Sequence, residues 1–212
     1  MKTAEEYKKL SISEFTKAAK MYDSDNAGIY EMCKDDYPPI LEEIRKEKFD
    51  TLLDAGCGTA PMLSLLVEKY PNKKFIGLDL TPEMIERAKA KNLPNTELIV
   101  GDCENLPFEE ETFDIIINSQ SFHHYPNPQD FFDSVHKVLK TGGCLILRDN
   151  TGSKALIWLM NHIMMPLANM VGHGDVKGYL IDEVREMCQK SGLKVEKLEA
   201  RKGHRLHLVA RK

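Results

Sequence analysis

Between about residues 49 and 150 the chain alternates short apolar runs with segments in which apolar positions recur every three or four residues. The first pattern is typical of β-strands and the second of amphipathic α-helices. One run is almost wholly apolar, as expected for a strand that a parallel sheet buries on both faces. The five strands predicted in this region are Phe49–Leu53, Lys74–Leu78, Thr96–Val100, Phe113–Asn118 and Cys144–Arg148.

Helices are predicted between these strands. Thr59–Lys69 follows the first strand. After the second strand, Thr81 is a good N-cap with Pro82 at the first helical position, and that helix runs to about Asn92. Another helix begins at Pro128. Four strand–helix–strand units in a row require right-handed crossovers, which indicates a parallel sheet with helices on both faces.

The two ends of the chain have different patterns. Residues 1–46 look helical and amphipathic, and residues 153–170 are expected to form a Met-rich helix or lid. Asp182–Ser191 is predicted as a helix, with Gly192 just beyond its end. Two final strands, predicted at Val195–Leu198 and Arg205–Val209, are too close in sequence for a helical crossover and should form an antiparallel hairpin.

The predicted fold class is α/β, with a doubly wound, mostly parallel, seven-stranded Rossmann-like sheet, a C-terminal antiparallel hairpin and helices on both faces. We expect one domain with four parts. These are an N-terminal helical cap (1–46), a core (47–150), a lid or insert (151–180), and a C-terminal helix with the edge hairpin (181–212).

The composition of the chain limits the classes of protein to which it can belong. Of 212 residues 42% are hydrophobic and the net charge is −4, without a basic stripe, so we expect no nucleic-acid partner. No run approaches the roughly 20 apolar residues of a membrane span, and the first residues lack the apolar core of a signal peptide. The five cysteines are widely spaced, which favours a reducing, cytoplasmic setting. A monomer or a homodimer is expected.

The first candidate site is the turn Asp54-Ala55-Gly56-Cys57-Gly58, at the carboxyl end of the first strand. Ligands of open α/β sheets bind at such strand ends, and glycines let the backbone approach them closely. A plain tight turn explains a lone G-x-G equally well. The third glycine of the dinucleotide fingerprint is missing, because Pro61 occupies its place.

Two aspartates add to the evidence that the glycine turn belongs to a ligand site. Asp79 ends the second strand, close to the roughly 20-residue spacing at which a carboxylate reaches ribose hydroxyls. Asp102 ends the third strand, where it can accept a hydrogen bond from the exocyclic amine of adenine. Each alone could be a turn or surface acid, but together they place an adenosine across three successive strand ends.

A family resemblance covers roughly residues 48–150. It rests on the segments LLDAGCGTA, FIGLDLTPEMIERAKAK, GDCENLPFEEETFDIIINSQSFHHYPNP and VLKTGGCLIL. Together they resemble the class I S-adenosylmethionine-dependent methyltransferases, above all the ubiquinone/menaquinone-biosynthesis type (methyltransferase type 11). The resemblance implies S-adenosylmethionine as cofactor and S-adenosylhomocysteine as product. It also implies cofactor contacts by Asp54, Ala55, Gly56, Cys57, Gly58, Asp79, Leu80, Met84, Asp102, Cys103 and Asn118.

Within that set, the resemblance implies which residues contact each part of the cofactor. The glycine turn lines the methionine part, Asp79 the ribose, and Asp102 with Cys103 the adenine. Asn118 is expected near the transferred methyl group. The N-terminal segment FTKAAKMYD resembles the family's opening motif, which caps the cofactor site. The resemblance therefore implies that Tyr22 contacts the cofactor as a lid residue; a helix that only packs is the alternative.

His123 and His124 follow the fourth strand and are the candidate general bases, with His124 preferred. Packing of this loop is the alternative. No H-x-x-x-H, D-x-D or Cys/His cluster indicates a metal site. The predicted function is methyl transfer to a small-molecule acceptor. A non-catalytic S-adenosylmethionine-binding regulator or partner subunit and an NAD(P)-dependent reductase are the alternatives.

Overall fold

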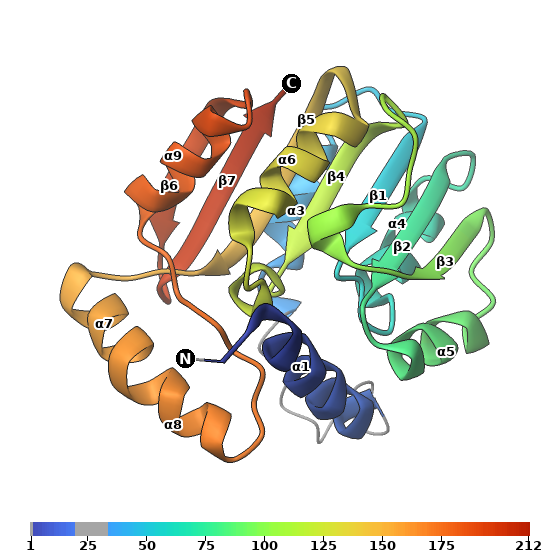
Figure 1. Cartoon of the computed structure of the whole chain (residues 1–212). Helices are drawn as coiled ribbons and strands as arrows, with labels where there is room; N and C mark the ends of the chain where they lie inside the picture. The colour runs from blue at the N-terminus through green and yellow to red at the C-terminus, as the bar shows by residue number, and fades with distance from the viewer. Residues whose placement is uncertain (1, 20–33) are drawn as a thin grey trace.

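The structure, a computed structural model, describes residues 2–19 and 34–212. At its centre is a seven-stranded sheet with the order β3-β2-β1-β4-β5-β7-β6 (Figure 1). The first five strands are parallel, and β7 pairs antiparallel with both β5 and β6, so the predicted fold class is confirmed. The strands are β1 (Thr51–Ala55), β2 (Lys74–Asp79), β3 (Thr96–Val100), β4 (Phe113–Ser119), β5 (Leu139–Asn150), β6 (Lys194–Arg201) and β7 (Arg205–Arg211).

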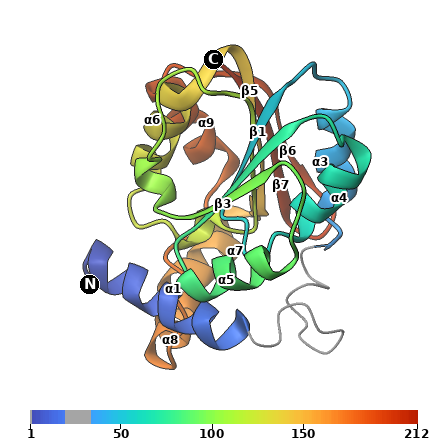
Figure 2. The ribbon, with the colours of Figure 1, turned by 90° about the vertical axis from the view of Figure 1, so that its right-hand side faces the viewer.

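Helices cover both faces of the sheet (Figure 2). The helices α3 (Tyr37–Ile44) and α4 (Pro61–Lys69) pack on one face, and α6 (Pro128–Val138) and α9 (Ile181–Lys190) pack on the other. Because β1 has β2 on one side and β4 on the other, the strand order reverses between β1 and β4. In open α/β sheets the ligand binds at this reversal, outside the carboxyl ends of the strands.

The central strand β4 shows how the two halves of the core form. Its residue Ile116 joins the core beneath α6 and α9, whereas the neighbouring Ile115 and Ile117 join the core beneath α3 and α4. This alternation follows from the two-residue period of a strand. Burying each such side chain contributes about 1.5–3 kcal/mol, which holds the carboxyl ends of the central strands in fixed positions.

Several predicted boundaries were wrong. The first strand begins at Thr51 instead of Phe49, because the Phe49 ring packs against the rings of Tyr70 and Phe75. The first helix begins at Pro61 instead of Thr59, because Ala60 has a left-handed φ of 62°. The fifth strand begins earlier than predicted, at Leu139, which pairs with Phe113.

One of the four predicted strand–helix–strand units was also wrong. The connection from β3 to β4 contains the short 3₁₀-helix η1 (Cys103–Asn105) and no α-helix. The helix before β3, α5 (Pro82–Ala90), ends two residues before Asn92, which has a left-handed φ of 49°. The Thr81 N-cap and Pro82 at the start of α5 are as predicted.

The segments outside the sheet gather at the carboxyl ends of the parallel strands, where α1 (Ala4–Ala19) lies beside α5 (Figure 2). The predicted Met-rich helix is three pieces: α7 (Lys154–Leu159), the π-helical η3 (Met160–Met164) and α8 (Met165–Met170). Pro166 lacks a backbone donor, and such breaks are expected near proline. Among the described residues, no helix is long and apolar enough to cross a bilayer.

Candidate functional site

A pocket opens at the carboxyl ends of β1, β2 and β3, where the sequence places its glycine turn and its acids. Its open space, with the solvent at its mouth included, measures about 650 Å³. Helix α1 contributes Lys8, Ser11 and Phe15 to the wall. The predicted site residues that line it are Gly56, Gly58, Asp79, Leu80, Met84, Asp102, Cys103 and His124.

The glycine turn requires glycine at its first position. Gly56 has a φ of +82°, and a Cβ there would lie 2.2 Å from the Ser121 hydroxyl oxygen. Any larger residue would therefore push the loop after β4 away from the pocket. The backbone N–H of Gly58 donates a 2.9 Å hydrogen bond to Asp79, so the turn and the end of β2 hold each other in place.

Asp79 is fixed by two backbone donors. One carboxylate oxygen accepts from Gly58, and the other accepts a 2.9 Å hydrogen bond from the N–H of Thr81 at the start of α5. Burial nevertheless raises the pKa of Asp79, outweighing these hydrogen bonds. The carboxylate is thus held in one orientation at the pocket wall.

Asp54 lies behind the pocket wall and is 4% exposed. Burial, followed by the negative charge of Asp79, raises the pKa of Asp54 to about 7. No cation among the described residues offsets these two effects. Two buried carboxyl groups beside one pocket, without such a cation, favour a positively charged ligand.

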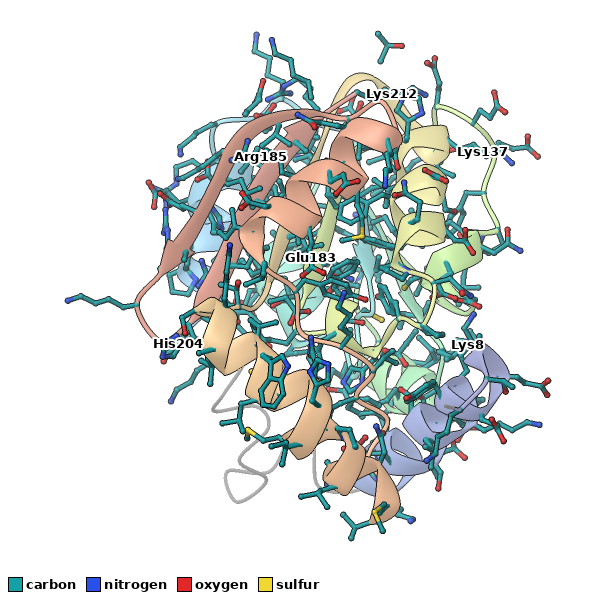
Figure 3. The ribbon with its side chains drawn as sticks, turned by 60° about the vertical axis from the view of Figure 1, so that its left-hand side comes forward. Lys8, Lys137, Glu183, Arg185, His204 and Lys212 are labelled. Atoms are coloured by element: carbon teal, nitrogen blue, oxygen red, sulfur yellow. The ribbon has the colours of Figure 1, made fainter. Side chains whose placement is uncertain are left out.

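Asp102 has a partner that the sequence did not reveal. One of its oxygens accepts a 2.9 Å hydrogen bond from the Glu104 N–H, and the other accepts a 2.6 Å bond from the Lys8 ammonium. Lys8 also pairs with Glu104. Burial lowers the pKa of Lys8, but the hydrogen bonds to these two acids outweigh it and raise that pKa. Lys8, labelled on α1 in Figure 3, thereby connects this helix to the two acids beside the end of β3.

Part of the chain matches a family of known proteins. The methyltransferase domain family matches residues 53–147, which contain the glycine turn and both pocket acids. The matched residues form a methyltransferase domain, and the relatives and solved structures below support the class I S-adenosylmethionine-dependent type.

Among relatives of this methyltransferase domain is a phthiotriol/phenolphthiotriol dimycocerosates methyltransferase of Mycobacterium leprae. It is 37% identical over 99 residues, covering 46% of this chain and 37% of that protein. A malonyl-[acyl-carrier protein] O-methyltransferase of Herminiimonas arsenicoxydans is 34% identical, covering 65% of this chain and 50% of that protein. The chain thus spans about half the length of these curated relatives, or less.

Solved structures show the same fold. A putative methyltransferase from Bacillus halodurans superposes with a TM-score of 0.69 at 25% identity, covering 78% of this chain and 71% of that one. A Haloferax volcanii putative methyltransferase, solved in complex with the Trm112 methyltransferase activator, has a TM-score of 0.74 at 20% identity. In that comparison 93% of this chain and 97% of the other are covered.

Asn118 does not line the pocket of the methyltransferase domain. It is fully buried and donates hydrogen bonds of 2.7 Å to the Ala55 carbonyl and 2.9 Å to the Tyr125 hydroxyl. The next residues, Ser119 and Gln120, line the pocket in its place. Ala55 and Cys57 are likewise buried behind the turn. Contact between Asn118 and the cofactor stays a prediction, and its observed contacts are those of a positioning residue.

The two candidate histidines differ in orientation. They belong to the 3₁₀-helix η2 (Phe122–His124). His124 lines the pocket, and its ring meets Phe15 edge-on at 5.1 Å. His123 turns toward the sheet, where its Nδ1 lies 2.7 Å from the Asp149 carboxylate. Burial, followed by the charge of His123, lowers the pKa of His124 to about 4, so its ring is neutral near pH 7.

Sequence reasoning missed the residues that reach the pocket from distant segments. Lys8, Ser11 and Phe15 come from an amphipathic helix whose docking surface the sequence does not mark. Tyr22, the predicted lid residue, lies outside the described residues. The Met-rich segments are absent from the part of the wall formed by described residues.

Proposed function

We propose that the chain transfers a methyl group from S-adenosylmethionine to a small-molecule acceptor and releases S-adenosylhomocysteine. The observation that carries this proposal is that the glycine turn, Asp79 and Asp102, from three successive strand ends, line one pocket. The cofactor's sulfonium supplies an already activated methyl group. The protein's part is to bind, orient and exclude water from the reactants.

The charges around the pocket suit this cofactor. S-adenosylmethionine carries positive charge on its sulfonium and its ammonium group. Asp54 and Asp79 are buried carboxyl groups whose pKa values are raised, and a cation close by would favour their ionised forms. Gly56, without a Cβ, leaves the backbone of the turn open to the ligand.

The enclosure of the pocket supports a small acceptor. Lys8, Ser11 and Phe15 of α1 form one side of the pocket, and the cofactor would share the pocket with the acceptor. At the end formed by the loop after β4, the polar groups of Ser121, His124 and Tyr125 line the wall. They can orient an acceptor through hydrogen bonds, which is how small-molecule sites set specificity.

Release of S-adenosylhomocysteine tests the proposal. Methyl-labelled S-adenosylmethionine is offered with a panel of carboxylic acids, thiols, amines and phenols, and with cell extract. We expect turnover with at least one acceptor, loss of it in Asp79→Ala, and no change in the control Asp182→Ala, which alters an exposed acid of α9.

Two outcomes would contradict it. Cofactor binding without release of S-adenosylhomocysteine by any acceptor or extract would instead indicate a non-catalytic binding regulator or partner subunit. Tight binding of NADH in a fluorescence titration, without binding of S-adenosylmethionine, would instead indicate a reductase.

A further inference from the structure

Beside the pocket, three side chains from two segments turn their donor atoms toward one point. His123 and His124 come from η2, and Asp175 comes from the loop that follows α8. The Asp175 carboxylate oxygen lies 3.4 Å from Nε2 of His123 and 3.7 Å from Nδ1 of His124. All three atoms lie within 4.8 Å of one another. The cluster borders the pocket, because His124 is part of its wall.

The proton on His123 is placed by a buried acid. Asp149, which is 2% exposed, lies with its carboxylate 2.7 Å from Nδ1 of His123 and also accepts a hydrogen bond from the His123 backbone N–H. A carboxylate partner holds a proton on Nδ1, so Nε2 is the ring atom left to bind a metal. Burial lowers the pKa of His123, but the carboxylates of Asp149 and Asp175 outweigh it and raise that pKa. Nε2 faces the carboxylate of Asp175, so a metal ion bound there would take the place of a proton on Nε2.

The second histidine brings another ring nitrogen to the same point. Nδ1 of His124 is buried and has no hydrogen-bond partner among the described residues. The side chains of His123 and His124 are 12% and 10% exposed, and that of Asp175 is 28% exposed. A cation between these atoms, either a proton on Nε2 of His123 or a metal ion, would offset the charge of the Asp175 carboxylate.

The distances fit a shared metal ion better than hydrogen bonds. Both separations from Asp175 exceed the usual 2.7–3.2 Å of a hydrogen bond. In a tetrahedral zinc site, with ligands about 2.0–2.2 Å from the metal, neighbouring ligand atoms lie about 3.3–3.6 Å apart. The two distances from Asp175, 3.4 Å and 3.7 Å, lie close to that separation.

The loop that carries Asp175 is held on both sides. Glu14 of α1 accepts a 2.7 Å hydrogen bond from the Gly174 N–H. The carbonyl of His123 accepts bonds of 2.9 Å and 3.2 Å from the backbone N–H groups of Val176 and Lys177. The carboxylate is therefore positioned by backbone contacts before any ion binds, as a preformed metal site requires.

We propose that His123, His124 and Asp175 bind one divalent transition-metal ion of the class that Zn²⁺ represents. Two imidazoles and one carboxylate form a three-ligand set that leaves a coordination position open. At the wall of the pocket, that position can take an oxygen, nitrogen or sulfur atom of the methyl acceptor. Asp149 acts on the metal through His123, as an outer carboxylate does in many metal sites. Metal binding itself does not depend on the proposed function.

Metal titration of the untagged full chain tests this directly. The protein is treated with chelator, dialysed and titrated with Zn²⁺ by calorimetry, and with Co²⁺ by its visible absorption. We expect one ion per chain and a Co²⁺ spectrum of low coordination number. Asp149→Asn should weaken Zn²⁺ binding by roughly 10–100-fold, the usual effect of removing a carboxylate that hydrogen-bonds a metal-ligating histidine. Asp175→Asn and His124→Ala remove a ligand and should weaken binding further.

The matched control is His162→Ala, which removes a histidine stacked on Trp158 at the surface. It should bind Zn²⁺ like the wild type. Binding of S-adenosylhomocysteine by each variant reports that the fold and cofactor pocket are intact, independently of the metal. Absence of stoichiometric Zn²⁺ binding in the wild type, or equal affinity in folded Asp175→Asn and His162→Ala, would overturn the proposal.

Discussion

Asp54 and Asp79 lie close enough for the charge of one to raise the pKa of the other. Both are buried, and Asp79 is oriented by backbone donors from two different elements. In the ligand-free protein, ionising two neighbouring buried acids lowers the free energy of unfolding. A cationic ligand would relieve this cost, so the same residues link cofactor binding to stability.

Stability of the ligand-free protein should therefore fall as pH rises from about 4 to about 7. The pKa of Asp54 is about 7 in the folded chain, above the ordinary value near 4. Between those values the unfolded chain has lost a proton that the folded chain keeps, so the free energy of unfolding decreases by up to about 1.4 kcal/mol per pH unit.

Urea unfolding between pH 4 and 8 measures this effect. Asp54→Asn cannot ionise and should lose most of the decline, while Asp182→Asn should behave like the wild type. An equal slope in wild type and Asp54→Asn would show that Asp54 does not carry the pH dependence.

Sequence spacing was sufficient to place Gly56, Asp79 and Asp102 in one pocket, because the carboxyl ends of adjacent parallel strands are neighbours in space. Lys8 could not be found this way, since it reaches Asp102 across 94 positions from a helix outside the sheet. Asp175 was missed for the same reason. Its closeness to His123 depends on the path of a loop, which no local pattern encodes.

At the scale of elements, α1 is the part that closes the site. Beyond Lys8, it is held by the Thr16 hydroxyl, which donates a 2.8 Å hydrogen bond to Glu83 of α5. Glu14 binds the loop after α8 on the other side. These contacts join α1 to the cofactor side and to the histidine side of the pocket, so displacement of the helix would open both.

Lys8→Met should loosen this helix and weaken binding of S-adenosylhomocysteine. The Lys8 side chain is 24% exposed, so a contribution of about 1 kcal/mol and a roughly fivefold higher Kd are expected. Hydrogen exchange of the α1 amides should accelerate. The matched control is Lys9→Met, which removes an exposed pair with Glu5 on the outer side of the helix. Equal Kd values for the two variants would contradict this role of Lys8.

The order and type of the core elements could be predicted, whereas their ends depended on tertiary contacts. The apolar run of β4 and the turn signal at Thr81-Pro82 are local, and both were correct. The predicted start of β1 was wrong, because the Phe49 ring packs against Tyr70 and Phe75 and the residue lies outside the strand. The π-helical segment at Met160–Met164 was also missed, since no periodicity marks it.

At the scale of the whole molecule, one buried carboxylate joins distant parts of the chain. Asp36, just before α3, is fully buried and lies 2.7 Å from Nε of Arg148 on β5. Gln120, which lines the pocket, donates a 2.8 Å hydrogen bond to its other oxygen. Arg205 of the C-terminal hairpin lies 3.7 Å away. This cluster connects the N-terminal helices, the pocket and the hairpin.

Arg148→Met should destabilise the protein by about 3–5 kcal/mol, because it leaves Asp36 buried without its main counter-charge. The free energy of unfolding in urea measures this loss. Lys190→Met is the control, since it breaks an exposed pair with Glu186 that is worth at most about 0.5 kcal/mol. A loss below about 1 kcal/mol in Arg148→Met would show that the cluster does not hold these parts together.

Calorimetric titration of the ligand-free chain with S-adenosylhomocysteine tests the central claim most directly. We expect one site per chain in the wild type and in Asp182→Asn. In Asp79→Asn the loss of charge-assisted hydrogen bonds should weaken binding by about 1–3 kcal/mol, roughly 5- to 150-fold in Kd. No binding by the wild type, or an unchanged Kd in folded Asp79→Asn, would contradict the assignment of this pocket to S-adenosylmethionine.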